Sequence, residues 1–307
     1  MNILAQRRMQ PKKRYNTALW VMVAPAILYF LLFRYAPISG VVIAFQRFSP
    51  FRGVLESEWV GWLYFRQFFG SVFLWRVLRN TLVIGFLYLL IAFPMPIILA
   101  LMLNVVQNRA LKKTAQTITL LPHFVSFVVI AGIAINFLSP STGVVNRLVA
   151  AVGGDPIYFM QEPRYFWWIY TFIRIFKETG YEAIIYLAAL TSIDPTLYEA
   201  AEADGANKII QLFYITLPSI VPTIVIMFLV RVGRLVSVSF EEVLLLQNDV
   251  ILETSEVIST FVYRRGLVNA DYSYATAVGL FETVVALTLV VGSNRIAKRF
   301  RDAATLW

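Results

Sequence analysis

The stretch YEAAEADGANKIIQLFYITLP, residues 198–218, is a polar interruption between two apolar segments. Asp194 and Pro195 precede it, and an aspartate N-cap followed by proline at the first helical position is typical of a helix start. Gly205 can adopt the left-handed backbone that ends such a helix. A second helix then begins near Asn207 and leads into the next apolar segment. The stretch therefore predicts two helices joined by a sharp turn.

The rest of the chain has the composition of an integral membrane protein. Of its 307 residues, 59% are hydrophobic and 15% are charged, and the mean hydropathy is +0.68. A soluble domain carries about 25% charged residues. The chain has no cysteine and one histidine, His123, which excludes disulfides, thiolate metal sites and histidine-rich sites. The net charge is +9, and the basic residues lie mostly at the ends of apolar segments. Membrane topology therefore explains the charge, and no nucleic-acid partner is expected.

Six apolar stretches are long enough to cross a bilayer, which takes about 20 helical residues. They are residues 15–33, 81–107, 114–146, 165–190, 209–246 and 273–294. Lysine and arginine gather in the N-terminal tail, after the second stretch and in the C-terminal tail, which indicates that all three are cytoplasmic. Arginines within residues 46–79 run against this rule, but the other flanks outweigh them. We expect an all-α integral membrane protein with six transmembrane helices and both termini cytoplasmic.

This topology divides the chain into three parts. Residues 1–16 are expected to form a retained cytoplasmic tail, because no short apolar core with a small-residue cleavage site follows their basic side chains. Residues 17–297 form the six-helix membrane domain, and residues 194–218 form its cytoplasmic loop between the fourth and fifth spans. Residues 298–307 form a second cytoplasmic tail.

The loop at residues 194–218 suits a protein partner better than a lipid surface. A helical protrusion with a glycine corner can dock in a groove of another protein. The alternative is an amphipathic helix that lies on the membrane. Glu199, Glu202 and Asp204 outnumber Lys208, and acidic side chains are repelled by the anionic inner leaflet. We therefore expect the loop to dock on a cytoplasmic partner.

The same residues resemble the EAA motif of ABC importer permeases, E-A-A-x-x-D-G-A-x(8)-I-x-L-P. The residues that match it are Glu199, Ala200, Ala201, Asp204, Gly205, Ala206 and the ITLP of residues 215–218. Over the whole chain, segments such as QTITLLPHFVS (116–126) and VISTFVYRRGLVN (257–269) resemble the oligosaccharide and polysaccharide permeases of the carbohydrate-uptake family. The resemblance implies a type I ABC importer permease in the bacterial cytoplasmic (inner) membrane.

The resemblance also implies a transport subunit that is not itself an enzyme. Its loop would dock in a cleft of an ATPase, where Glu199 meets the ATPase and Gly205 forms the corner. The sequence has no G-x-x-x-x-G-K-[ST] motif. This chain would thus bind no cofactor, and ATP and Mg²⁺ would belong to partner subunits. The implied partners are a second homologous permease that completes a heterodimer, two ATPase subunits, an extracytoplasmic sugar-binding protein, membrane lipid and the oligosaccharide.

Two spans carry charged side chains deep in the membrane, where each costs about 2.5–3.5 kcal/mol on insertion scales and usually marks a pathway. As helices, the two spans would each present one such face. The fourth would present Arg174, Lys177, Glu178, Tyr181 and Glu182, and the fifth Arg231, Arg234 and Ser237, followed by Glu241 and Glu242. At a rise of about 1.5 Å per residue, both faces reach near or beyond mid-membrane. We expect them to line the substrate pathway, as the resemblance implies.

The charges favour an acidic, uronate-bearing oligosaccharide, because arginine binds carboxylates through paired hydrogen bonds. Many neutral-sugar permeases of the family carry small or amide residues where this chain has Lys177, Glu178, Arg231 and Arg234. An internal ion-pair network with a neutral substrate stays open, since the fourth span carries two cations and two anions.

Two other classes of protein are disfavoured. A membrane enzyme could use Glu178 and Glu182 as acid and base, but no nucleophile elbow, HExxH motif or aspartate dyad accompanies them. An ATP-independent carrier would show inverted repeats or broken helices, and the sequence indicates neither.

Overall fold

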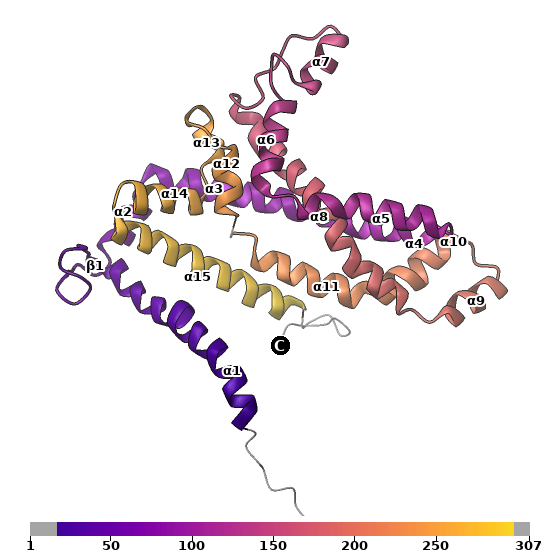
Figure 1. The fold of residues 1–307 in the computed structure, drawn as a ribbon, viewed down its shortest axis with the longest axis horizontal. Helices are drawn as coiled ribbons and strands as arrows, with labels where there is room; N and C mark the ends of the chain where they lie inside the picture. Colours follow the sequence, from indigo (N-terminus) through magenta and orange to yellow (C-terminus); the bar gives the residue numbers. More distant parts are fainter. Residues whose placement is uncertain (1–16, 237, 298–307) are drawn as a thin grey trace, which may run out of the picture.

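The computed structural model describes residues 17–236 and 238–297, so both predicted tails, 1–16 and 298–307, lie outside the described residues. The described chain is mostly helical (Figure 1). Its α-helices are α1 (Thr17–Phe30), α2 (Leu63–Phe69), α3 (Val72–Leu87), α4 (Pro94–Val105), α5 (Arg109–Phe124), α6 (Phe127–Phe137), α7 (Val144–Ala151), α8 (Phe166–Thr191), α9 (Pro195–Ala203), α10 (Lys208–Gln211), α11 (Leu217–Gly233), α12 (Phe240–Leu246), α13 (Leu252–Ser255), α14 (Ile258–Tyr263) and α15 (Tyr272–Ala297).

Shorter helical turns connect several of these helices. The π-helical turns are Leu31–Tyr35, Tyr88–Ala92, Leu212–Thr216 and Arg264–Val268, and the 3₁₀ helices are Ala36–Phe45, Pro163–Tyr165 and Asp249–Ile251. One small hairpin departs from the all-α prediction. Its strands β1 (Gln46–Arg47) and β2 (Glu58–Trp59) pair antiparallel, with Arg47 opposite Glu58.

Four helical segments of the described chain are long and apolar enough to cross a membrane. They are Leu19–Phe45, Val72–Val105, Lys208–Gly233 and Tyr272–Arg295, and a bent pair of helices makes up to five. Helix α8 has the length of a span, with 26 residues, but four charged side chains lie in its middle. Because α8 is not among those candidates, six spans and two cytoplasmic termini stay predictions.

The predicted third span, residues 114–146, is bent in the structure. Helices α5 and α6 meet at an angle of 99°. Val125 and Ser126 between them have extended backbones, and the Ser126 side chain accepts a hydrogen bond from the amide of Val129 and so begins a new helix. Lys177 of α8 donates to the carbonyl oxygens of His123 (2.8 Å) and Val125 (2.9 Å). A side chain from another helix thus satisfies carbonyls that a continuous helix would have paired.

Two other span boundaries also differ from the prediction. The second span begins at Val72, nine residues before the expected start, so Arg76 and Arg79 lie on a helix rather than in an outer connection. The fifth was expected to run through residue 246, but α11 ends at Gly233 and α12 begins only at Phe240.

Four apolar clusters occur among the described residues, and three of them hold the bundle together along its length. Ala100, Tyr186 and Ile220 join α4, α8 and α11. Ile84, Phe127 and Tyr170 belong to a central cluster that also includes residues of α12. The third cluster joins α2, α3, α14 and α15. In Figure 1 it lies at the left-hand end, and α9 lies at the right-hand end.

Helix α1 stands apart from this bundle (Figure 1). The side chains from Leu19 to Phe33 are all exposed. A fully apolar helix without protein neighbours needs lipid or another subunit around it.

Candidate functional site

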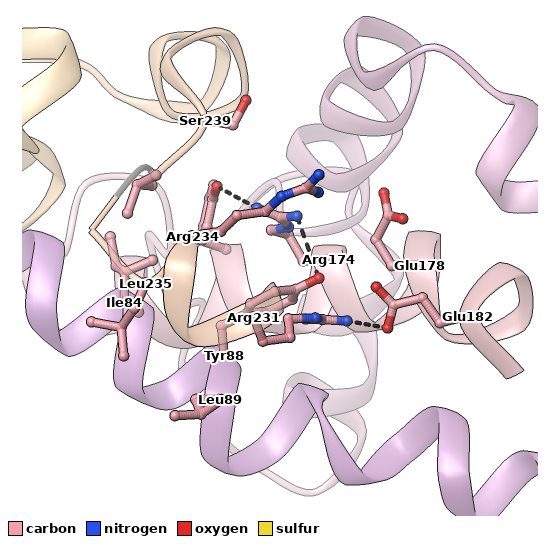
Figure 2. Close-up of a pocket in the computed structure, with 13 residues that line it drawn as sticks. Ile84, Tyr88, Leu89, Arg174, Glu178, Glu182, Arg231, Arg234, Leu235 and Ser239 are labelled. Atoms are coloured by element: carbon pink, nitrogen blue, oxygen red, sulfur yellow. Dashed lines mark hydrogen bonds and ion pairs between the residues drawn. The ribbon is translucent and has the colours of Figure 1, made fainter. Parts of the chain in front are cut away.

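A cavity of about 270 Å³ lies where α3, α8 and the segment after α11 meet (Figure 2). Its lining residues are Ile84, Gly85, Tyr88, Leu89, Tyr170, Arg174, Glu178, Glu182, Arg231, Arg234, Leu235, Val238 and Ser239. Five predicted pathway residues are therefore brought together by the fold. Three come from α8, Arg231 comes from the last turn of α11, and Arg234 directly follows that helix.

The cavity-lining charges of α8 follow a four-residue spacing. Arg174, Glu178 and Glu182 lie one helical turn apart and share one face of the helix. The predicted polar face was broader than this, because it also included Lys177 and Tyr181. The structure separates that second set.

Lys177 and Tyr181 face α5 and are not among the cavity-lining residues. The Tyr181 ring stacks on the His123 ring, with centroids 3.9 Å apart and planes inclined by 5°. Glu178 lies between the two environments, since it lines the cavity and also approaches Nδ1 of His123 at 3.3 Å. Lys177, Tyr181 and His123 thus form one contact region at the bend between α5 and α6.

Arg234 and Ser239 line the cavity from the non-helical segment between α11 and α12. Arg234 follows α11 in a turn in which its amide donates to the carbonyl of Arg231 (2.9 Å). Ser237, predicted on the same helical face, lies outside the described residues. The predicted face from Arg231 through Glu242 on one continuous helix is wrong, because Gly233 ends α11.

Two of the three cavity arginines have carboxylate partners. Arg231 pairs with Glu182 of α8, and both side chains are largely buried. Arg174 lies 3.4 Å from a carboxylate oxygen of Glu242, which also accepts a 2.9 Å hydrogen bond from the Tyr170 hydroxyl. These contacts support the internal ion-pair network for Arg174 and Arg231.

Tyr88 lies between these two arginines and was missed by the sequence reasoning. The guanidinium carbons of Arg174 and Arg231 lie 4.3 and 4.2 Å from its ring centroid. Arg174 also donates to the Tyr88 hydroxyl at 3.3 Å. A cation over an aromatic ring is stabilised electrostatically. A tyrosine in an otherwise apolar segment was the only available signal in the sequence.

Arg234 differs from the other two arginines. Its guanidinium forms neither an ion pair nor a hydrogen bond with any residue that the structure describes, and its side chain extends into the cavity (Figure 2). The buried Nη1 of Arg231 likewise has no hydrogen-bond partner within the described chain. The Arg234 guanidinium therefore offers N–H donors that suit a ligand with carboxylate or hydroxyl oxygens.

The EAA motif forms the expected helix, turn and second helix at the opposite end of α8. The Asp194 side chain caps α9 by accepting from the amide of Thr196 (2.9 Å). Hydrogen bonding with Thr196 holds the pKa of the Asp194 carboxyl below its usual value. Gly205 has a φ of +78°. The amide of Gly205 donates to Glu202, and that of Ala206 donates to Ala201, which is the pattern of a Schellman C-cap.

Further contacts hold this corner against α10 and the following π-helical turn. Lys208 pairs with Glu202, and the hydrogen bond from Lys208 lowers the pKa of that carboxyl. The hydroxyls of Tyr198 and Thr216 are 2.9 Å apart.

The outer face of the corner remains open to a partner. Among the motif residues, Glu199, Ala200, Asp204 and Gly205 are exposed, and Ala201 and Ala206 are half-buried. Ile209, Phe213 and Tyr214 beside them are also exposed.

Comparison with known proteins identifies the family. Residues 92–303 match the model of the binding-protein-dependent transport system inner membrane component. Protein LplB of Bacillus subtilis is 42% identical over 282 residues, covering 92% of this chain and 89% of that protein. The polygalacturonan/rhamnogalacturonan transport system permease protein YteP of Bacillus subtilis is 42% identical over 297 residues, covering 97% of this chain and 92% of that protein.

Two solved structures have a similar fold. A chain of a bacterial ABC transporter involved in the import of the acidic polysaccharide alginate has a TM-score of 0.87 and 43% identity. The alignment covers 94% of the present chain and 97% of the transporter chain. A second alginate transporter structure, in complex with an alginate pentasaccharide-bound periplasmic protein, also has a TM-score of 0.87, with 42% identity and 95% and 97% coverage. The chain therefore belongs to the binding-protein-dependent transport system inner membrane components, the membrane-embedded permease subunits of ABC importers.

Proposed function

We propose that this chain is one of two permease subunits of an ATP-driven importer of acidic, uronate-bearing oligosaccharides. A solute-binding protein delivers the sugar, and alternating access moves it into the cytoplasm. The observation that carries the acidic substrate is Arg234, a guanidinium in the cavity without an ion pair among the described residues. A uronate carboxylate supplies the charge and the planar geometry that such a group binds best.

The relatives support the same substrate class. One permease is named for polygalacturonan and rhamnogalacturonan transport, and two similar structures belong to importers of alginate, an acidic polysaccharide. Within the cavity, Arg174 and Arg231 contribute to a paired network around Tyr88, and we assign direct carboxylate binding to Arg234. Glu178 and Glu182 lie in position to accept hydrogen bonds from sugar hydroxyls.

In the proposed membrane arrangement the chain crosses the bilayer six times. Helix α8 and the bent α5–α6 pair join the four apolar candidates, and both termini are cytoplasmic. The exposed face of α9 then docks on an ATPase subunit, with Glu199 at the contact and Gly205 at the corner. A second, homologous permease completes the pathway, and ATP and Mg²⁺ bind to two ATPase subunits.

The alternative is a neutral oligosaccharide held by hydrogen bonds to the ion-pair network. The two paired arginines favour it, because their charges are already neutralised. Arg234 distinguishes the two cases. Binding of an acidic substrate would depend on the positive charge of Arg234, whereas binding of a neutral substrate would not.

The experiment uses the whole importer, reconstituted in proteoliposomes with its second permease, ATPase subunits and binding protein. ATPase stimulation is measured with oligomers of alginate and galacturonate and with the same oligomers after carboxyl reduction. We expect stimulation by the acidic oligomers. For Arg234→Gln, the half-maximal sugar concentration should rise on the order of tenfold or more, because a charge-assisted hydrogen bond is worth about 1.5–3 kcal/mol.

The matched control is Arg47→Gln. Arg47 is an exposed arginine of the hairpin that pairs with Glu58 at 3.3 Å and does not line the cavity, so its loss should leave stimulation unchanged. Equal stimulation by acidic and carboxyl-reduced oligomers would contradict the acidic substrate.

A further inference from the structure

The start of α3 and the π-helical turn after α14, which lie toward the end of the molecule opposite α9 (Figure 1), carry four arginines. Arg76 and Arg79 lie in the first two turns of α3, and Arg264 and Arg265 begin the π-helical turn after α14. They are not part of the cavity at Arg234. In the proposed topology this end faces the extracytoplasmic side, where the binding protein delivers its sugar.

One buried carboxylate serves two of these arginines. Glu256 is only 1% exposed, and its two oxygens pair with Arg76 and Arg264. Arg79 instead donates to the backbone carbonyl of Glu253 at 2.9 Å, and its guanidinium carbon lies 5.7 Å from the Trp167 ring centroid. The charge of Glu256 therefore cannot neutralise the whole group.

Arg265 has no carboxylate partner among the described residues. Its guanidinium carbon lies 5.4, 5.6 and 5.7 Å from the ring centroids of Phe73, Phe261 and Tyr274. Three rings hold the cation in place without using its N–H donors. Burial is the main cause that lowers the pKa of Arg264; repulsion by Arg76 and Arg265 lowers it further, and Asp249 acts in the opposite direction.

We propose that Arg265 and its neighbouring arginines form an outer receiving site that binds a uronate carboxylate of the oligosaccharide as it leaves the binding protein. This inference rests on the proposed function and adds a second carboxylate site to it. The geometry favours a planar carboxylate, because a guanidinium positioned over aromatic rings presents its N–H groups at the edge of its plane. Arg76 and Arg264 add a positive potential that attracts an anionic chain.

A line of contacts connects this site to the cavity. Arg79 lies over Trp167, and Tyr170 and Arg174 follow three and seven residues later on the same face of α8. The Trp167 indole also donates to the carbonyl of Thr254 (2.8 Å), close to Glu256 in sequence. The first uronate at Arg265 and a later one at Arg234 would thus be held by the same chemistry at two depths.

The test measures ATPase stimulation of the reconstituted importer against the concentration of binding protein loaded with a uronate oligomer. Arg265→Gln should raise the half-maximal concentration on the order of tenfold, because it removes one charge-assisted contact. Arg265→Lys keeps the charge over the rings but loses the planar fork, and should give an intermediate shift. If Arg265→Gln does not assemble, Arg265→Lys carries the test.

The matched control is Arg164→Gln. Arg164 also lies over an aromatic ring, that of Tyr165 at 4.7 Å, but has its own carboxylate partner, Glu162 at 3.7 Å. Its loss should leave the half-maximal concentration unchanged. A parallel measurement with the carboxyl-reduced oligomer should show no effect of Arg265→Gln.

Three results would overturn the site. An unchanged half-maximal concentration in both Arg265 variants would mean that the arginine does not bind sugar. An equal shift with the carboxyl-reduced oligomer would mean that Arg265 acts only by positioning its neighbours. An equal loss of affinity for the empty binding protein would assign the carboxylate to that protein. Failure of the proposed function is distinct, because the wild-type importer would then not distinguish acidic from reduced oligomers.

Discussion

Arg231 of α11 and Glu182 of α8, which are 49 residues apart in sequence, form an ion pair that joins the two helices. Their side chains are 9% and 15% exposed. Because the pair forms one wall of the cavity, it couples the stability of the bundle to the arrangement of the site.

Removal of either partner should destabilise the protein strongly. Arg231→Met or Glu182→Gln alone should each cost about 3–5 kcal/mol, since a buried charge is left without its partner. The double variant should cost clearly less than the sum. Thermal unfolding of the purified permease complex in a double-mutant cycle measures the coupling. The exposed pair Arg47 and Glu58 is the control, with an expected coupling of about 0–1 kcal/mol. Additive losses at Arg231 and Glu182 would show that the two side chains do not interact.

Lys177→Met should destabilise the bend between α5 and α6. It leaves the carbonyls of His123 and Val125 without their donor, and each unpaired carbonyl costs about 1–3 kcal/mol. Unfolding temperature should fall, while the half-maximal concentration of sugar stays unchanged. Lys177→Arg should recover part of the stability because it keeps a cationic donor. A selective loss of acidic-sugar stimulation with normal stability would instead restore Lys177 to the substrate pathway.

Gly180→Ala should separate α5 from α8. A Cβ at this position would lie 1.9 Å from the carbonyl oxygen of Thr119, so the two backbones must move apart, at a cost of about 1–3 kcal/mol or more. The yield of folded protein in detergent and its unfolding temperature should both fall. Gly132→Ala in α6 is the control, because a Cβ there meets nothing within 4 Å. Equal behaviour of the two variants would mean that α5 and α8 are not packed this closely.

Glu199→Lys should weaken the coupling between the permease and its ATPase subunits. Glu199 is exposed on α9, so the substitution should leave expression and folding intact while it reverses the charge at the proposed ATPase contact. Sugar-stimulated ATPase activity and uptake should both drop. Glu56→Lys, at an exposed position between the two strands, controls for charge reversal alone. Normal coupling in Glu199→Lys would remove that residue from the contact.

The EAA segment was predictable because its signals are local. The N-cap at Asp194, the turn at Gly205 and the second start at Asn207 all depend on neighbours within a few residues. The prediction that the fourth apolar stretch forms one helix through its charged residues was also confirmed, because helix formation depends on local backbone preferences.

The site was only partly predictable. Helical spacing placed Arg174, Glu178 and Glu182 together, and the cavity contains all three. The same spacing could not tell which side of α8 packs against α5, so Lys177 and Tyr181 were grouped with them.

Other members of the site needed the folded chain. Glu242 reaches Arg174 only after α11 has ended and the chain has turned back. Tyr88 joins from the π-helical turn that follows α3, where hydropathy reveals an apolar segment and nothing about its neighbours. The bend after His123 depends in part on a lysine 54 residues later.

The sequence by itself determined that this protein is apolar enough for the membrane, that its polar motif forms a helical corner, and that one long helix, α8, carries charged side chains in its middle. These properties follow from transfer free energies and from backbone preferences, which act residue by residue. Only the tertiary structure decided which arginines are paired and which, like Arg234 and Arg265, have no carboxylate partner in the described chain. Ion pairing depends on distances of a few ångströms between helices, and spacing along one helix does not specify them.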